Sequence, residues 1–281
     1  MNKKIVAIGG GENGRITSDG TRKPYETGPI DQEIIHLTGK ENPHFLFLAH
    51  SQDTIENENS YFETMQAIYN GKYGCECKHL LKDQLNNIEY AKSLVNWADI
   101  IYEGGGNTLD MIKLWKDTGF DKILYNAWNE GKVLCGLSAG ANCWFEACSS
   151  DSLQIKFGPD QPLISMECLG FLKGFFVPHC DEPGRTETAK EFIKEKNMVG
   201  LFLSNCSALE IIDDSYRVIY GTPANKTFKP YALKAYWQGE DFKILKMITN
   251  WYFLYIEFLS DNKYHINIEI IMGGIKCTQL N

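Results

Sequence analysis

Residues 133–140 read VLCGLSAG, an apolar run that stops at Ser138 between two glycines. This Gly-x-Ser-x-Gly pattern is typical of a nucleophilic serine on a sharp turn between a strand and a helix. Side chains two positions before and after the serine would collide in that turn, so Gly136 and Gly140 suit it. The turn lifts the hydroxyl above the sheet, beside backbone N–H groups that can stabilise an oxyanion. The pattern predicts Ser138 as a nucleophile.

Short apolar runs of the same kind recur along the chain and alternate with helix-compatible segments. Strand-like runs cover residues 4–8, 45–49, 99–102, 133–137, 175–177 and 200–203. Residues 209–212 and 217–220 predict a hairpin. This alternation favours an α/β fold with a mostly parallel sheet flanked by helices on both faces. We expect a catalytic domain over residues 1–235, followed by an aromatic-rich extension, 236–281, whose structure the pattern leaves undecided.

The composition excludes several classes of partner. The 281 residues carry a net charge of −8, which argues against nucleic acid or an anionic membrane as the main partner. No segment approaches the roughly 18 apolar residues that a membrane span needs. The apolar run Lys4–Ile8 is too short for the core of a signal peptide. The nine cysteines form no disulfide framework, so we expect reduced thiols and a cytoplasmic protein.

A serine hydroxyl needs a base to become a good nucleophile. His179 follows the apolar run 175–177, and parallel strands end at one edge of a sheet, so we expect it near Ser138. His50 also follows a strand and is the second candidate. The remaining histidines, which have no catalytic context in the sequence, are His36, His44, His79 and His265.

A second glycine cluster, residues 104–106, follows the run 99–102. Glycine lets backbone amides approach a ligand closely. We expect the N–H groups of Gly105 or Gly106, together with that of Ala139, to form an oxyanion hole.

Two further patterns are weak. Residues 9–14, GGGENG, match the dinucleotide pattern G-x-G-x-x-G, but a loop broken by glycine and proline follows instead of a helix. Residues 75–79, CECKH, have metal-ligating side chains but no second half-site with suitable spacing. We therefore predict no cofactor and no metal.

Three segments in this order resemble one known family: EGGGNT at 103–108, CGLSAGANC at 135–143 and VPHCDEPGR at 177–185. They resemble peptidase E, the aspartyl dipeptidase of serine peptidase family S51, and the related cyanophycinases. The resemblance runs from the first strand to about residue 235. It implies a fold like that of class I glutamine amidotransferases, a Ser-His-acid triad, and hydrolysis of dipeptides with an N-terminal aspartate, without metal or cofactor. The partner implied is a small peptide, and a homodimer stays open.

In the resemblance, Ser138 matches the family nucleophile, His179 the family histidine, and residues 104–106 the oxyanion segment. The acidic third member of the family maps onto Asn205. An amide can orient an imidazole but brings no charge, and an Asp-to-Asn change in one serine protease costs about 10⁴ in kcat. We predict Asn205 as the third member. The alternatives, in which a carboxylate substitutes for it, are Glu210, Asp181, Glu182 and Asp151.

A preference for aspartate needs a cation in the site. Arg185, just after the histidine motif, is the candidate, because a guanidinium pairs with a carboxylate in a bidentate manner. Glu12 or Glu103 could hold the substrate's amino group. Three functions stay open: an aspartyl dipeptidase, a cyanophycinase-like β-aspartyl peptidase, and a non-catalytic protein that binds an aspartyl ligand.

Overall fold

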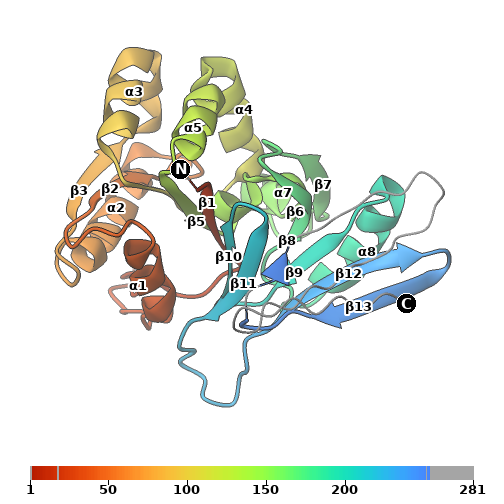
Figure 1. Ribbon diagram of the computed structural model, residues 1–281. Helices are drawn as coiled ribbons and strands as arrows, with labels where there is room; N and C mark the ends of the chain where they lie inside the picture. Colours follow the sequence, from red (N-terminus) through yellow and green to blue (C-terminus); the bar gives the residue numbers. More distant parts are fainter. Residues whose placement is uncertain (1, 18, 251, 254–281) are drawn as a thin grey trace.

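The computed structural model describes residues 2–17, 19–250 and 252–253, which form a mixed α/β fold with two sheets (Figure 1). The strands of the first sheet are β1 (Lys4–Ile8), β2 (His44–Leu48), β3 (Glu76–Leu80), β4 (Ile100–Glu103), β5 (Val133–Leu137), β10 (Ser207–Ile212), β11 (Ser215–Tyr220) and β14 (Tyr252–Phe253). Their order is β14-β11-β10-β1-β5-β4-β2-β3. Strands β1 to β5 run parallel, and β10, β11 and β14 continue the sheet in antiparallel pairing.

The second sheet has six strands in the order β13-β12-β9-β8-β6-β7. They are β6 (Phe145–Ser150), β7 (Ile164–Glu167), β8 (Leu172–Val177), β9 (Gly200–Leu203), β12 (Ala232–Gln238) and β13 (Asp241–Lys246). Strands β6, β8 and β9 are parallel and form the centre, whereas β7, β12 and β13 pair antiparallel at the edges.

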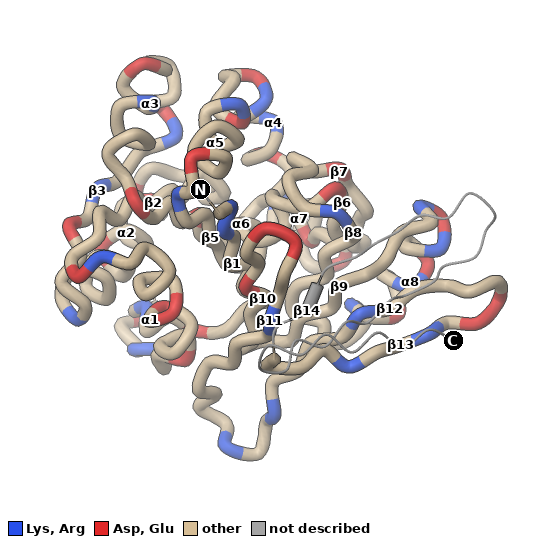
Figure 2. Tube along the Cα trace, viewed as in Figure 1, with Lys and Arg blue, Asp and Glu red and all other residues tan. Residues whose placement is uncertain are grey.

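The helices are α1 (Gly28–His36), α2 (Ile55–Tyr69), α3 (Ile88–Trp97), α4 (Thr108–Thr118), α5 (Phe120–Asn129), α6 (Ala139–Asn142), α7 (Ser152–Phe157), α8 (Arg185–Lys196) and the 3₁₀ turn η1 (Lys82–Asn86). Within the described ranges, none of them is both long and apolar enough to span a membrane. Many charged residues lie on helices and turns, such as the acidic turn at residues 213–214 between β10 and β11 (Figure 2).

The core follows from the alternation of side chains along the buried strands. On β1, Ile5 and Ala7 pack into the cluster that contains α3, α4, α5 and one face of the second sheet. Val6 and Ile8 point to the opposite face and pack against α1 and α2. Helix α8 covers the far face of the second sheet. Successive side chains of a strand point to opposite faces, so an all-apolar strand requires cover on both sides.

The structure confirms the predicted alternation of strands and helices and the hairpin of β10 and β11. The expectation of one mostly parallel sheet is wrong, because the strands divide into two sheets that each carry antiparallel members. Apolar runs show that a strand is buried, but they do not specify its partner.

The expected boundary at 235/236 falls inside β12, which pairs with β9 over Ala232–Ala235. Part of the aromatic-rich extension therefore completes the second sheet. Within that extension, residue 251 and residues 254–281 lie outside the described residues.

Candidate active site

The turn at the end of β5 holds Ser138 in an unusual backbone conformation, with φ 55° and ψ −109°. Positive φ is uncommon for a residue other than glycine and marks local strain. A Cβ on Gly136 would lie 2.3 Å from the carbonyl oxygen of Gly140, and one on Gly140 would lie 2.1 Å from that of Glu103. Only glycine fits at both positions. This is the tight turn that the Gly-x-Ser-x-Gly pattern predicts.

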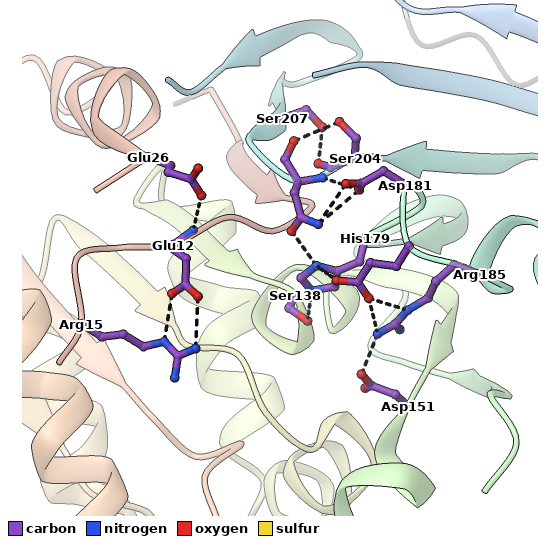
Figure 3. A network of polar contacts seen from close by, with 12 residues as sticks. Glu12, Arg15, Glu26, Ser138, Asp151, His179, Asp181, Arg185, Ser204 and Ser207 are labelled. Carbon is purple, nitrogen blue, oxygen red and sulfur yellow. Dashed lines mark hydrogen bonds and ion pairs between the residues drawn. The ribbon is translucent and has the colours of Figure 1, made fainter. Parts of the chain in front are cut away.

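Three predicted site residues form one hydrogen-bonded chain, and Figure 3 labels two of them, Ser138 and His179. Ser138 Oγ lies 2.9 Å from His179 Nε2, and His179 Nδ1 lies 2.8 Å from Asn205 Oδ1. The three residues follow β5, β8 and β9, so they come from both sheets. The arrangement has the connectivity of a Ser-His-acid triad, with an amide in the third place.

The segment after β1 joins the two sheets at this point. The carbonyl of Ile8 accepts the N–H of Ser138, that of Gly9 accepts the N–H of His179, and that of Gly10 accepts the N–H of Cys206. A Cβ on Gly10 would lie 2.2 Å from Asn205 Oδ1 and 2.4 Å from His179 Nδ1. The glycine run 9–11 therefore packs against the proposed catalytic residues. The sequence pattern suggested only a weak nucleotide motif here, because the neighbours of a loop glycine are not visible in sequence.

Two of the four alternative carboxylates form ion pairs with arginines and make no hydrogen bond to His179. Glu210 is fully buried on β10 and pairs with Arg217 at 2.8 Å. Asp151 pairs with Arg185 at 2.8 Å. Glu182 and Asp181 come closer: Glu182 Oε1 lies 3.5 Å from His179 Nδ1, and Asp181 hydrogen-bonds to Asn205. Asn205 thus remains the group that hydrogen-bonds directly to the imidazole.

The structure corrects the expectation for Arg185. Its side chain is buried and pairs with Asp151 at 2.8 Å and with Glu182 at 3.3 Å. It is not among the described residues that line the cleft. The guanidinium is satisfied by protein carboxylates, so we no longer assign it to a substrate carboxylate.

An open cleft of about 1100 Å³ lies above Ser138 and His179. Its described lining contains four carboxylates, Glu12, Glu26, Asp181 and Glu182. Arg15 is the single Lys or Arg in that lining, and it pairs with Glu12 at 2.9 and 3.2 Å. Half of the Arg15 side chain, 54%, is exposed. No motif in the sequence marks Arg15, which stands in the Gly- and Pro-broken loop.

Gly105 lines the cleft, and a Cβ on it would lie 3.5 Å from Ser138 Cβ. Its N–H points to the hydroxyl of Tyr61 at 3.4 Å, and burial raises the pKa of Tyr61 to about 12. No hydrogen bond within the described residues uses the N–H of Ala139. Gly106 packs elsewhere, because a Cβ on it would lie 2.4 Å from the carbonyl oxygen of Ser51. Gly105 therefore lies beside the serine with its N–H directed to Tyr61, whereas the N–H of Ala139 has no partner within the described residues.

The structure places His50 and Glu103 in the interior. His50 Nδ1 accepts from Trp115 Nε1 at 2.8 Å, so its Nε2–H donates to the carbonyl of Leu80 at 2.8 Å. Burial lowers the pKa of His50 to about 3, which keeps the ring neutral. Glu103 is also fully buried, burial raises its pKa well above the ordinary value, and it accepts the N–H of Ser51. Neither residue reaches the cleft, whereas Glu12 does.

The thiols near the site are packing groups. Cys180 is buried, and burial raises its pKa to about 12, so its reactive thiolate is scarce at neutral pH. Burial also raises the pKa values of Cys135 and Cys143 well above the ordinary value. Over the described part of the chain, no group of three or more His, Cys, Asp or Glu side chains is arranged to hold a metal ion.

Comparisons with known proteins give a family match, a curated relative and solved structures of similar fold. The model of peptidase family S51 matches residues 15–219. An uncharacterized peptidase of Bacillus subtilis (strain 168), YgaJ, is 34% identical over 218 residues, which cover 75% of this chain and 84% of the relative. A peptidase from an acI-B1 actinobacterium is similar in structure, with a TM-score of 0.61, 17% identity, and coverage of 88% of this chain and 95% of that one. A putative peptidase E of Listeria monocytogenes EGD-e has a TM-score of 0.54, 16% identity, and coverage of 78% and 99%.

Proposed function

Because the chain belongs to peptidase family S51, we propose that it is a serine peptidase that hydrolyses small peptides, foremost dipeptides with an N-terminal aspartate. Membership of this family supports a peptidase, and hence a hydrolase. The serine mechanism rests on one observation above all, the chain of hydrogen bonds from Ser138 through His179 to Asn205. A cytoplasmic location and the likeness to class I glutamine amidotransferases stay predictions.

In the proposed mechanism, His179 Nε2 removes the proton of Ser138 Oγ as the oxygen attacks the peptide carbonyl. The new C–O bond leaves an oxyanion, which the N–H of Ala139 stabilises together with that of Gly105, once the latter leaves the Tyr61 hydroxyl that it meets at 3.4 Å. His179 then gives its proton to the leaving amine, the C–N bond breaks, and the acyl group stays on Ser138. A water molecule, deprotonated by His179, attacks this ester and releases the acid in the same way.

Arg15 is the cation that we propose for the aspartate side chain of the substrate. It lines the cleft and is half exposed, whereas Arg185 is enclosed by carboxylates. Its partner Glu12 lies on the same loop and would neighbour the bound aspartate. The other carboxylates of the lining offer a place for the free ammonium group of a peptide, because opposite charges attract strongly in a partly enclosed cleft.

The size of the cleft favours a second candidate substrate. About 1100 Å³ lies at or above the range of roughly 300–1,000 Å³ of typical small-ligand sites, so a peptide longer than a dipeptide fits. A cyanophycinase-like β-aspartyl peptide is therefore retained as an alternative. The third candidate function is a protein that binds an aspartyl ligand without hydrolysing it. It is favoured by the lack of a charge on Asn205, because an uncharged third member does not stabilise the imidazolium.

The test compares hydrolysis of an Asp-p-nitroanilide by the wild type and by Ser138→Ala. Turnover that the substitution abolishes supports the serine peptidase, and equal release by both proteins contradicts it. Asp-Leu and β-aspartyl peptides, assayed side by side, separate the two substrate classes. Labelling of Ser138 by a fluorophosphonate probe gives a readout that needs no substrate. An unlabelled serine together with no turnover supports the binding protein.

A further inference from the structure

Asp181, which Figure 3 labels, makes three hydrogen bonds to Asn205. Its Oδ1 accepts the backbone N–H of Asn205 at 2.7 Å. Both of its oxygens also face the side-chain amide nitrogen, with Nδ2 at 3.3 Å from Oδ1 and 3.1 Å from Oδ2. The polar chain from Ser138 thus continues one step past the third member and ends on a carboxylate.

The carboxylate decides which way the amide of Asn205 points. An ionised carboxylate only accepts hydrogen bonds, so the NH₂ group must face Asp181. The amide oxygen then faces His179 Nδ1, at 2.8 Å. An oxygen without a hydrogen can only accept, so Nδ1 must carry the proton of the imidazole. Nε2 is left with a lone pair toward Ser138 Oγ, which is the protonation state that a general base needs.

An asparagine without such a neighbour can turn its amide over. Its NH₂ group would then donate to Nδ1, and the proton of the imidazole would move to Nε2, where it blocks base catalysis. This wrong tautomer is the reason given for the loss of about 10⁴ in kcat when the triad Asp of one serine protease becomes Asn. The geometry around Asp181 removes that alternative.

We propose that Asp181 is a positioning residue that sets the tautomer of His179 through Asn205 and supplies, one side chain removed, the negative charge that the third position lacks. The proposal rests on the proposed serine mechanism. It explains how an uncharged third member can serve in this chain. Its Oδ1 lies 2.7 Å from the backbone nitrogen of Asn205, so this hydrogen bond holds the carboxylate beside the amide.

Other charges also face the imidazole and must be separated from Asp181. Glu182 Oε1 lies 3.5 Å from Nδ1, whereas Glu182 Oε2 lies 3.3 Å from Arg185. Arg185 in turn pairs with Asp151. Glu182 is thus partly neutralised by a guanidinium, and its carboxylate lies outside hydrogen-bond geometry with the ring. Glu182→Gln is therefore the matched control for the loss of one nearby negative charge.

The first experiment observes the tautomer of His179 by ¹⁵N NMR of histidine-labelled protein, with His179→Gln used to assign its signals among the six histidines. We expect the Nδ1–H form in the wild type at a pH where the ring is neutral. A wild-type ring protonated on Nε2 overturns the proposal without any variant at position 181. The readout needs no turnover, so it stays valid if the proposed peptidase activity fails.

The second experiment compares Asp181→Asn with the double variant Asp181→Asn, Asn205→Asp. The single variant should populate the Nε2–H tautomer, lower kcat/KM by between about 10-fold and about 10⁴-fold, and move the acidic limb of the pH–rate profile to lower pH. In the double variant, the new carboxylate at position 205 lies directly beside Nδ1. This variant should recover kcat/KM to within about 10-fold of the wild type.

Glu182→Gln should keep the Nδ1–H tautomer. If Asp181 only anchors the loop, the single variant will keep the wild-type tautomer and the double variant will not recover, and either result overturns the proposal. Fluorophosphonate labelling rates replace kcat/KM if no peptide is turned over.

Discussion

Gly10→Ala is a small change with a large expected effect on catalysis. The added Cβ would lie 2.2 Å from Asn205 Oδ1 and 2.4 Å from His179 Nδ1, whereas ordinary contacts begin at about 3.4 Å. One side of the hydrogen bond between these atoms must therefore shift by about 1 Å. Its length of 2.8 Å would then exceed the limit of a useful hydrogen bond. A misplacement of about 1 Å in a catalytic group costs roughly 10² in rate.

The assay measures kcat/KM on the substrate of the wild type and the rate of fluorophosphonate labelling of Ser138. We expect both to fall by about 10² in Gly10→Ala, while circular dichroism shows a folded protein. Gly28→Ala is the matched control, because it makes the same change at the start of α1, where the Cβ meets the Tyr25 ring at 3.3 Å. Activity of Gly10→Ala within about threefold of the control would refute the reasoning.

Three further outcomes are expected. Arg15→Ala should raise KM for an aspartyl peptide by about 10-fold at nearly constant kcat. Arg22→Ala is the control, because Arg22 lies outside the main cleft, and it should leave KM unchanged. Equal KM values for the two variants would show that Arg15 does not bind the substrate. Burial raises the pKa of Asp31 to about 6, so its contribution to folding is present below about pH 4 and is lost as pH rises through 6. In urea titrations, Asp31→Asn should therefore gain about 2 kcal/mol relative to the wild type between pH 4 and pH 7, and a constant difference would contradict this. His50→Phe should lower stability by about 2–4 kcal/mol in thermal unfolding, since it leaves the Trp115 N–H and the Leu80 carbonyl without their partner; an unchanged Tm would contradict the buried hydrogen bonds.

The sequence predicted the parts of the site that depend on local backbone geometry. A serine between two glycines after an apolar run specifies the turn at Ser138 because each glycine clashes with its near surroundings if it gains a side chain. His179 was predicted because an apolar run ends just before it and parallel strands share an edge, and Asn205 because the resemblance to family S51 places the third member there. The three side chains meet even though the strands belong to two sheets, because residues 8–10 bridge the sheets at this edge.

The partners of charged and small residues could not be predicted in the same way. Arg185 follows the histidine motif in sequence, yet its side chain turns into the protein to meet Asp151, 34 residues earlier. Arg15 stands in a loop without a motif and reaches the cleft only because that loop folds beside Ser138. Which carboxylate faces a guanidinium depends on how distant segments pack together. Local sequence patterns do not show which distant residues become neighbours.

The sequence by itself therefore determined the elements, the strained turn and the ends of the strands, because apolar period and backbone sterics act over a few residues. Only the tertiary structure decided the division into two sheets, the tight packing of Gly10 and the contact of Asp181 with Asn205. These features join atoms that are far apart in the chain, so they exist only once the strands have paired and the core has closed.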